Sequence, residues 1–233
     1  MARLAPRILP AAASLGRDEA RLTFVGHSTF LIESPGGVRI ATDYNDYLRP
    51  PGTPDVATMN HAHSTHFTDR PDPAIKHVLR GWTSAPDGGR HDVTVGDARV
   101  RNVVTNIRDW RGGTERGGNS IFVFEMADLC IAHLGHLHHA LTPEHLRELG
   151  RVDVALVPVD GSWTLNLDGL DEVLRQLGAP LVVPMHYFNP GTLERFLDRV
   201  VDRYEVKRSD TAEVTLSRAS LPARPTLLVL PGR

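Results

Sequence analysis

The sequence predicts an α/β sandwich, in which two sheets pack together and helices cover their outer faces within one domain. Strand-like segments fill the first half of the chain, whereas strands and helices alternate in the second half. Size and composition fit one domain with a substantial core, since the 233 residues are 41% hydrophobic and 23% charged. We expect this domain to occupy residues 21–233, preceded by a loose N-terminal extension at residues 1–20.

The first half of the chain predicts short strands separated by turn residues. Glycine, serine and proline at 26–28 and 34–37 separate three apolar runs, which predicts an antiparallel meander. A glycine-rich segment at 111–118 contains four glycines, and we expect it to be a mobile loop. The strands expected in this half are 21–25, 29–33, 38–42, 55–59, 76–79, a hairpin at 92–105 that turns at Gly96-Asp97, 120–125 and 129–133.

Helices enter the pattern in the second half. Thr142 followed by Pro143 predicts a helix start, because threonine caps helix N-termini and proline is favoured at the first helical position. The helices expected here are 142–149, 169–177 and 192–204, and the strands are 152–158, 180–186, 214–216 and 227–230. No composition break marks a linker, so one domain remains the prediction.

Charge and cysteine content exclude several classes of partner. The formal net charge is −2, which gives no basic excess for nucleic acid or for an acidic membrane surface. No apolar run approaches the roughly 18 residues that span a bilayer. Cys130 is the only cysteine and lies in an apolar run, so we expect a small core residue without an internal disulfide.

The N-terminus allows two interpretations of location. Residues 1–16 carry Arg3 and Arg7 before an alanine-rich stretch, which faintly resembles a signal peptide. The apolar part is short and is interrupted by Pro10, so we expect a cytoplasmic protein. Export to the periplasm is the alternative.

Three histidines at the end of an expected buried strand form the strongest functional signal. His61, His63 and His66 follow the run at 55–59. In extended backbone, residues two apart point the same way, so His61 and His63 can face one point, and a turn can bring His66 to it. Imidazole is the commonest metal-binding side chain, which favours a metal site over a histidine-rich polar loop.

Histidines also follow two later strands. His136 comes after the expected strand at 129–133, and His186 ends the strand at 180–186. Polar residues at successive strand ends gather along one edge of a layered sheet, so we expect both histidines to bind metal. The alternative for each is a neutral core histidine that donates to a backbone carbonyl. We expect His139, beside His138, to support the site from behind the ligands.

The segments 58–69, 134–142 and 183–187 together resemble the metallo-β-lactamase superfamily. The most similar branch is that of small stand-alone hydrolases, which includes the ascorbate-phosphate lactonase, and residues 24–33 and 183–187 are particularly similar to it. The resemblance extends over about 22–187 and is specific, because five separate motifs occur in order. It implies a metallo-β-lactamase-like αββα sandwich with a metal site at the sheet edges.

The sequence departs from the family pattern at the expected ligands. Thr65 replaces the aspartate of the family's His-x-His-x-Asp-His motif, Arg108 aligns with a ligand histidine, and His136 stands where the family has a bridging aspartate. The resemblance keeps His186 as the terminal histidine and Asp43 as the strand-end aspartate. We expect Asp43 to orient the histidine loop by hydrogen bonds rather than to bind metal.

These departures predict one metal ion per chain instead of two. A neutral imidazole offers one lone pair to a metal, so His136 cannot bridge two cations, and Arg108 cannot be a ligand. One metal position would retain only His61 and His63. The other would have His66, His136 and His186, a three-histidine set typical of catalytic zinc. Zinc is therefore the expected metal, with iron or manganese as alternatives.

Two functions are consistent with this set. The first is a metal-dependent hydrolase acting on a small anionic ester, lactone or phosphoester, with Arg108 binding the anionic part. In it, Asp69 is the candidate base and Thr65 the candidate hydrogen-bond partner of the attacking water. The second is a non-catalytic protein that binds a metal or a small molecule on a degenerate hydrolase fold, because fold alone does not carry function.

Overall fold

The computed structural model describes residues 14–85, 88–109 and 111–232. Most of the expected N-terminal extension, residues 1–13, lies outside the described residues. The first strand begins at Glu19, two residues before the predicted start of the domain at residue 21. In the described part of the chain, no helix has the length and apolar character needed to cross a membrane.

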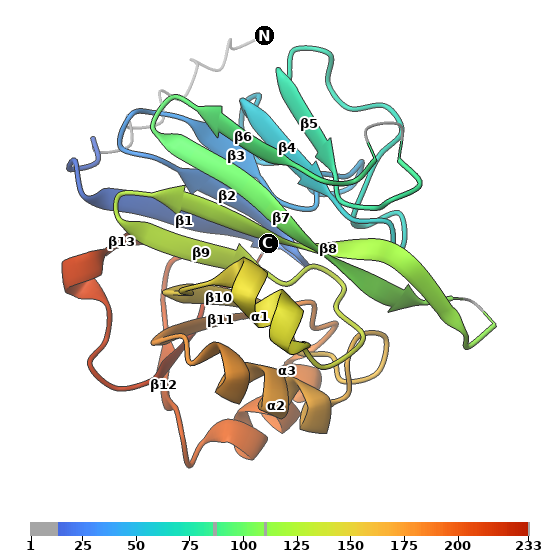
Figure 1. The fold of residues 1–233 in the computed structure, drawn as a ribbon. Helices are drawn as coiled ribbons and strands as arrows, with labels where there is room; N and C mark the ends of the chain where they lie inside the picture. The colour runs from blue at the N-terminus through green and yellow to red at the C-terminus, as the bar shows by residue number, and fades with distance from the viewer. Residues whose placement is uncertain (1–13, 86–87, 110, 233) are drawn as a thin grey trace, which may run out of the picture.

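Two mixed sheets form the centre of the molecule, which confirms the predicted α/β class (Figure 1). The six-stranded sheet has the order β13 (Glu213–Ser217), β1 (Glu19–Gly26), β2 (Thr29–Glu33), β3 (Arg39–Ala41), β4 (Val56–Met59), β5 (His77–Arg80). The eight-stranded sheet has the order β12 (Glu205–Arg208), β14 (Thr226–Val229), β11 (Leu181–Met185), β10 (Val154–Pro158), β9 (Leu129–His133), β8 (Thr114–Met126), β7 (Ala98–Arg108), β6 (Asp92–Val95). The α-helices are α1 (Pro143–Leu149), α2 (Leu167–Leu177) and α3 (Pro190–Val200), and η1 (Arg218–Ser220) is a single 3₁₀ turn.

Apolar side chains divide the molecule into layers. One core lies between the two sheets, where Phe30 of β2 and Phe122 of β8 are fully buried. A second core lies between the eight-stranded sheet and the three α-helices (Figure 1). The outer face of the six-stranded sheet packs against loop residues such as Tyr44 and Trp82. Helices therefore cover one outer face, and loops pack on the other.

The helix boundaries follow from their caps. The side chain of Thr142 accepts a hydrogen bond from the His145 backbone and α1 ends at Leu149, as the sequence predicts, with Gly150 following at a φ of 67°. Asn166 caps α2, which starts at Leu167, two residues before the predicted residue 169. Asn189 and Pro190 start α3 earlier than predicted, and its end at Val200 leaves room for β12, which sequence analysis did not predict.

The prediction of a mobile loop at 111–118 is wrong from Thr114 onward. Residues Thr114–Met126 form the long strand β8, which pairs with β7 through Arg108 and Thr114 at one end. Gly117 and Gly118 lie where the register of this pair shifts, and glycine in a strand often marks such a bulge. Their carbonyls accept hydrogen bonds from the backbones of Thr83 and His61. The extension of β8 carries the sheet alongside the histidine segment, where the carbonyl of Gly118 accepts from the His61 backbone.

Parallel strands place the functional residues at one edge. Strands β9, β10 and β11 run parallel to one another, and so do β3, β4 and β5. The carboxyl ends of parallel strands lie at the same edge of a sheet, and sites of α/β proteins form there. The predicted histidines follow β4, β9 and β11 at these ends.

Candidate metal centre

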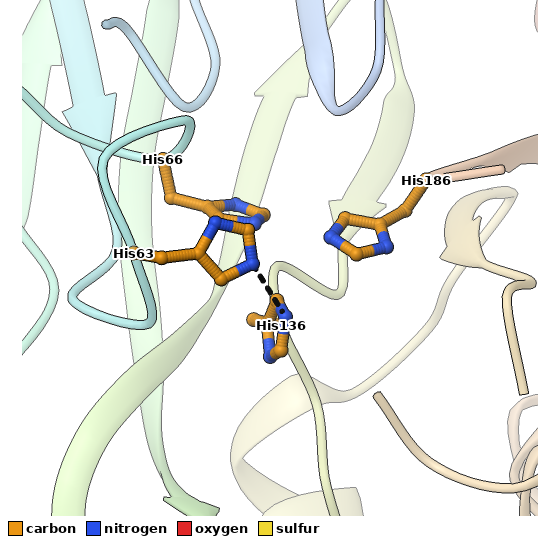
Figure 2. A group of neighbouring side chains, drawn as sticks. All are labelled: His63, His66, His136 and His186. Atoms are coloured by element: carbon orange, nitrogen blue, oxygen red, sulfur yellow. Dashed lines mark hydrogen bonds between the residues drawn. The ribbon is translucent and has the colours of Figure 1, made fainter. Parts of the chain in front are cut away.

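Four histidines from three separate segments converge on one point (Figure 2). His63 and His66 follow β4, His136 follows β9, and His186 comes directly after β11. One ring nitrogen from each lies within 4.8 Å of the corresponding atoms of the others. His66, His136 and His186 are buried, whereas His63 is half-buried.

Two of these rings are fixed by carboxylates on the side away from the centre. Nδ1 of His66 lies 2.5 Å from Oδ2 of Asp43, and Nδ1 of His186 lies 3.0 Å from Oδ2 of Asp160. A carboxylate accepts hydrogen bonds, so it holds the proton on Nδ1 and leaves the lone pair on Nε2. Nε2 of His66 and of His186 is buried without a hydrogen-bond partner among the described residues.

The other two rings are held at Nδ1 by neutral groups. Nδ1 of His63 lies 2.8 Å from Oγ1 of Thr65, and Nδ1 of His136 lies 2.6 Å from Nε2 of His138. Nε2 of His63 and Nε2 of His136 are 3.0 Å apart (Figure 2). All four rings therefore direct Nε2 inward, while a separate group holds each Nδ1.

The surroundings keep His63, His66 and His136 neutral. Burial, followed by repulsion from neighbouring histidines, lowers the pKa of these three rings. A neutral imidazole carries a lone pair on one ring nitrogen, and a metal at this centre binds the tautomer in which that lone pair is on Nε2. The buried, unpartnered Nε2 atoms thus fit a metal ion.

The two carboxylates behind the rings differ in environment. Burial raises the pKa of Asp43, although His133 and Asn60 partly oppose this effect. Burial also acts to raise the pKa of Asp160, but hydrogen bonds from His186 and Thr164 outweigh it and lower that pKa. Asp160 is therefore ionised more readily than Asp43.

Strained backbone accompanies the site. His27, Asp43 and His186 have φ angles of 51°, 42° and 55°, in the left-handed region that residues other than glycine rarely adopt. The His186 backbone donates a 2.7 Å hydrogen bond to the His27 carbonyl, which ties two of these positions together. Such strain persists only where surrounding contacts impose it, and it is typical of functional sites.

Two buried asparagines position the ligands and their supports. Asn60 donates to Oδ1 of Asp43 at 3.0 Å and accepts from the Ser120 backbone at 2.8 Å. Asn119 accepts from the His136 backbone at 2.8 Å. Both amides approach Gly135 so closely that an added Cβ there would lie 2.5 Å from each, so only glycine fits at this position.

The structure does not bring His61 into the four-histidine cluster. Nδ1 of His61 lies 3.0 Å from Oε1 of Glu115, and its ring stacks on Trp82 with centroids 5.1 Å apart. His63 instead joins His66, His136 and His186, so the centre has four histidines rather than the expected three. The chain leaves the extended conformation after Met59, and the rule that residues two apart face alike no longer applies.

The other predicted site residues take different positions. Asp43 contacts His66, as expected of an orienting residue. Thr65 contacts the far nitrogen of His63, which makes it a support for a ligand. Asp69 is exposed on the surface. The His139 ring accepts from the Asn106 backbone and contacts its neighbour's carbonyl at Ala140, whereas His138 is the ring that supports His136.

Arg108 lies beside the centre at the wall of a hollow of about 440 Å³. Its Nη2 donates to the carbonyls of Ser162 and Thr164, at 3.3 and 2.9 Å, and its Nε lies 3.3 Å from Nδ1 of His138. The hollow is lined by Ala62, His63, Arg108, Asp109, Gly112, His136, His138, Ser162 and Trp163. Two cluster histidines therefore open onto the space that Arg108 borders.

Sequence analysis missed Asp160 and the two asparagines. Asp160 follows β10 by two residues, so the rule that polar residues gather at strand ends could have identified it. Asn60 and Asn119 carried no such signal, because their roles depend on which backbone groups the two sheets bring near them.

Comparison with known proteins gives a family match across the site. Residues 21–186 match the model of the beta-lactamase superfamily domain, and this span includes all four histidines. A metal-dependent hydrolase of the UPF0173 group from Methanoculleus marisnigri is 29% identical over 189 residues, which cover 72% of this chain and 80% of the relative. A second UPF0173 metal-dependent hydrolase, from Salinibacter ruber, is 27% identical over 221 residues, with 82% and 94% covered.

A solved structure shares the fold over nearly the whole chain. It belongs to a candidate zinc-dependent hydrolase of the metallo-beta-lactamase superfamily from Thermotoga maritima. The TM-score is 0.65 with 29% sequence identity, and the match covers 92% of this chain and 100% of that chain.

Proposed function

The chain belongs to the beta-lactamase superfamily, and we propose that its four-histidine centre binds one metal ion and hydrolyses a small anionic ester, lactone or phosphoester. The observation that carries this proposal is the orientation of the rings. Four Nε2 atoms face one point, while Asp43, Asp160, His138 and Thr65 hold the four Nδ1 atoms. Metal-binding histidines are typically oriented in this way. The UPF0173 relatives, described as metal-dependent hydrolases, support the same reaction class.

Zinc is the first candidate for the metal. Imidazole suits zinc and iron, whereas manganese prefers carboxylate and water oxygens. All four donors are imidazoles, so we rank iron second and manganese last. His61 contacts Glu115 and Trp82, which leaves one centre of four histidines among the described residues.

When bound, such a metal lowers the pKa of its water and polarises the scissile group. The chain's own residues supply the remaining functions. Asp43 and Asp160 keep His66 and His186 in the binding tautomer. Arg108 places a permanent positive charge at the hollow into which His63 and His136 open, which suits a phosphate or carboxylate.

A second candidate function is non-catalytic metal binding. Four protein ligands can complete a tetrahedral zinc site, whereas catalytic zinc retains a position for water or substrate. The histidine best placed to leave such a position is His63, because it is half-buried and only a hydroxyl supports its Nδ1. A hydrolase therefore requires that His63 yield to substrate or that the metal accept a fifth ligand.

Cobalt substitution combined with turnover assays tests the proposal. The metal-free protein is loaded with cobalt(II), and its visible spectrum is recorded with and without phosphate. We expect one metal per chain, a spectrum that phosphate changes, and turnover within a panel of phosphoesters and lactones. A spectrum unaffected by anions, together with no turnover, would establish the closed binding site instead. His66→Gln should lose the metal, whereas His77→Gln, a histidine on β5 outside the cluster, should retain it.

A further inference from the structure

Trp163 is an exposed aromatic residue beside the candidate metal centre, and it is not part of the buried core. Trp163 is 66% exposed, and it lines the 440 Å³ hollow together with His63 and His136. A hollow of this size matches those that hold small organic ligands, which run from about 300 to 1,000 Å³. A large exposed aromatic group at such a place indicates a binding surface.

The backbone that carries Trp163 is held firmly although its side chain is exposed. Oδ1 of Asp160 accepts hydrogen bonds from the backbones of Ser162, Trp163 and Thr164, at 2.9, 2.6 and 3.2 Å. The other oxygen of the same carboxylate lies 3.0 Å from Nδ1 of His186. One side chain thus fixes both a metal-facing ring and the loop of Trp163, so the backbone that carries the indole has a set position relative to the centre.

Arg108 binds the same loop from the other direction. Its Nη2 donates to the carbonyls on either side of Trp163, those of Ser162 and Thr164. Nη1 of Arg108 makes no hydrogen bond to the described residues, so it remains available to a ligand in the hollow. The guanidinium and the indole therefore border the same hollow.

The remaining charges of the hollow leave Arg108 as its dominant ion. Asp109 is the one carboxylate among the lining residues. Its Oδ1 accepts from the backbones of Arg111 and Gly113, at 2.8 and 2.9 Å, so part of its charge serves the local turn.

We propose that the hollow recognises a planar aromatic ring together with an anionic group, so that the substrate is an aryl ester or an aryl phosphoester. The ring stacks on the indole of Trp163, and the anionic group meets Nη1 of Arg108 and the inward face of His63 and His136. This proposal rests on the proposed function for the hydrolysis reaction only. Recognition of the ring and of the anionic group depends on Trp163 and Arg108 alone.

Two phosphonates that cannot be hydrolysed test the assignment. Phenylphosphonate and methylphosphonate carry the same anionic group and differ in the ring, and calorimetry measures both affinities on metal-loaded and on metal-free protein. We expect the wild type to bind phenylphosphonate about tenfold more tightly than methylphosphonate. Trp163→Ala should reduce this preference to within about twofold without changing the affinity for methylphosphonate, and Trp163→Phe should retain most of it.

Tyr47→Ala is the matched control, because Tyr47 is 69% exposed and lies outside the hollow. It should keep the full preference. A preference that survives Trp163→Ala, or a wild type that shows none, overturns the inference. Metal content separates this outcome from failure of the proposed function. A protein that takes up no metal but still prefers the phenyl compound contradicts metal-dependent hydrolysis and supports the ring site.

Discussion

Nε of Arg108 lies 3.3 Å from Nδ1 of His138, and the other nitrogen of that ring lies 2.6 Å from Nδ1 of His136. A guanidinium can only donate hydrogen bonds, so Nδ1 of His138 accepts and its proton resides on Nε2. His138 then donates to His136, whose proton is held on Nε2, the atom that faces the centre. The Arg108–His138 contact therefore favours the tautomer of His136 that cannot bind a metal.

The first prediction follows from this competition. Arg108→Ala should raise the affinity for zinc about three- to tenfold, since His138 becomes free to accept from His136. The same substitution should weaken phosphate binding, because the charge at the hollow is lost. Zinc affinity is measured by competition with a chelating dye, and phosphate affinity by calorimetry. Arg147→Ala, which removes an exposed arginine paired with Glu144 on α1, should change neither. A fall in both the zinc affinity and the phosphate affinity would show that the Arg108–His138 contact does not set the tautomer of His136.

The second prediction concerns the two carboxylates behind the rings. Asp160→Asn keeps the shape of the side chain but removes the charge that holds Nδ1–H of His186. Zinc affinity should fall about 10- to 100-fold, the usual effect of removing a group that orients a ligand. Asp43→Asn should act similarly through His66. Asp92→Asn is the control, because that carboxylate pairs with Arg99 on the surface of the eight-stranded sheet, and unchanged affinities in all three variants would refute the orienting role.

The third prediction separates the neighbouring histidines of the segment after β4. His63→Ala should lower zinc affinity by at least about tenfold, since one of four donors is lost. His61→Ala should leave one tightly bound zinc per chain, because this ring contacts Glu115 and Trp82 instead. Elemental analysis after dialysis against a weak chelator measures both. Loss of zinc in the His61 variant would show that His61 is a metal ligand.

The fourth prediction concerns pH and the metal-free protein. Burial lowers the pKa of His66, His133 and His136 in the folded chain, whereas the unfolded chain titrates near the ordinary value of 6.5. The unfolded state binds more protons below that pH, so the stabilising contribution is complete above pH 6.5 and is lost as the pH falls toward the folded pKa. Each such histidine removes up to about 1.4 kcal/mol of the free energy of unfolding per pH unit.

Urea unfolding at pH 7.5 and pH 5.5 measures this loss, and His133→Gln supplies the comparison. His133 contacts the Ser28 carbonyl and the Gly135 backbone and lies outside the metal-facing cluster, so the variant removes one shifted histidine while the four donors stay in place. Its stability should fall less between the two pH values than that of the wild type. Asp43, whose pKa burial raises, acts in the opposite sense. Removing His133 also removes an interaction that lowers the pKa of Asp43, which changes the pH dependence in the same direction. Equal pH dependence in the two would show that His133 is not neutral in the folded state.

The fold class and most elements could be predicted from local patterns, and the failures have a common cause. The part of β8 that contains Gly117 and Gly118 was predicted as a loop because its position depends on backbone hydrogen bonds to Thr83 and His61, which are distant in the sequence. The number of helices on each outer face is likewise set by packing. Alternation of apolar residues identifies a strand, but it does not identify what covers its outer side.

The outline of the candidate site could also be predicted, because it depends on the order of the strands along the chain. His136 and His186 follow strands that run parallel, so their gathering at one edge could be anticipated from the chain order. The choice between His61 and His63 could not be anticipated, because it depends on the turn that the chain takes after Met59. Arg108 was expected to bind an anion, but its contact with His138 depends on the three-dimensional position of the end of β7 relative to the loop after β9.

The shared carboxylate of Asp160 affects how this scaffold can diversify. One of its oxygens orients His186 and the other holds the loop of Trp163, so substitutions that reshape this wall of the hollow also disturb the metal-facing ring. The opposite wall, which includes Asp109 and Gly112, is held by hydrogen bonds within its own turn. New substrate preferences can therefore arise there with little loss of metal affinity, and libraries intended to alter selectivity belong on that wall.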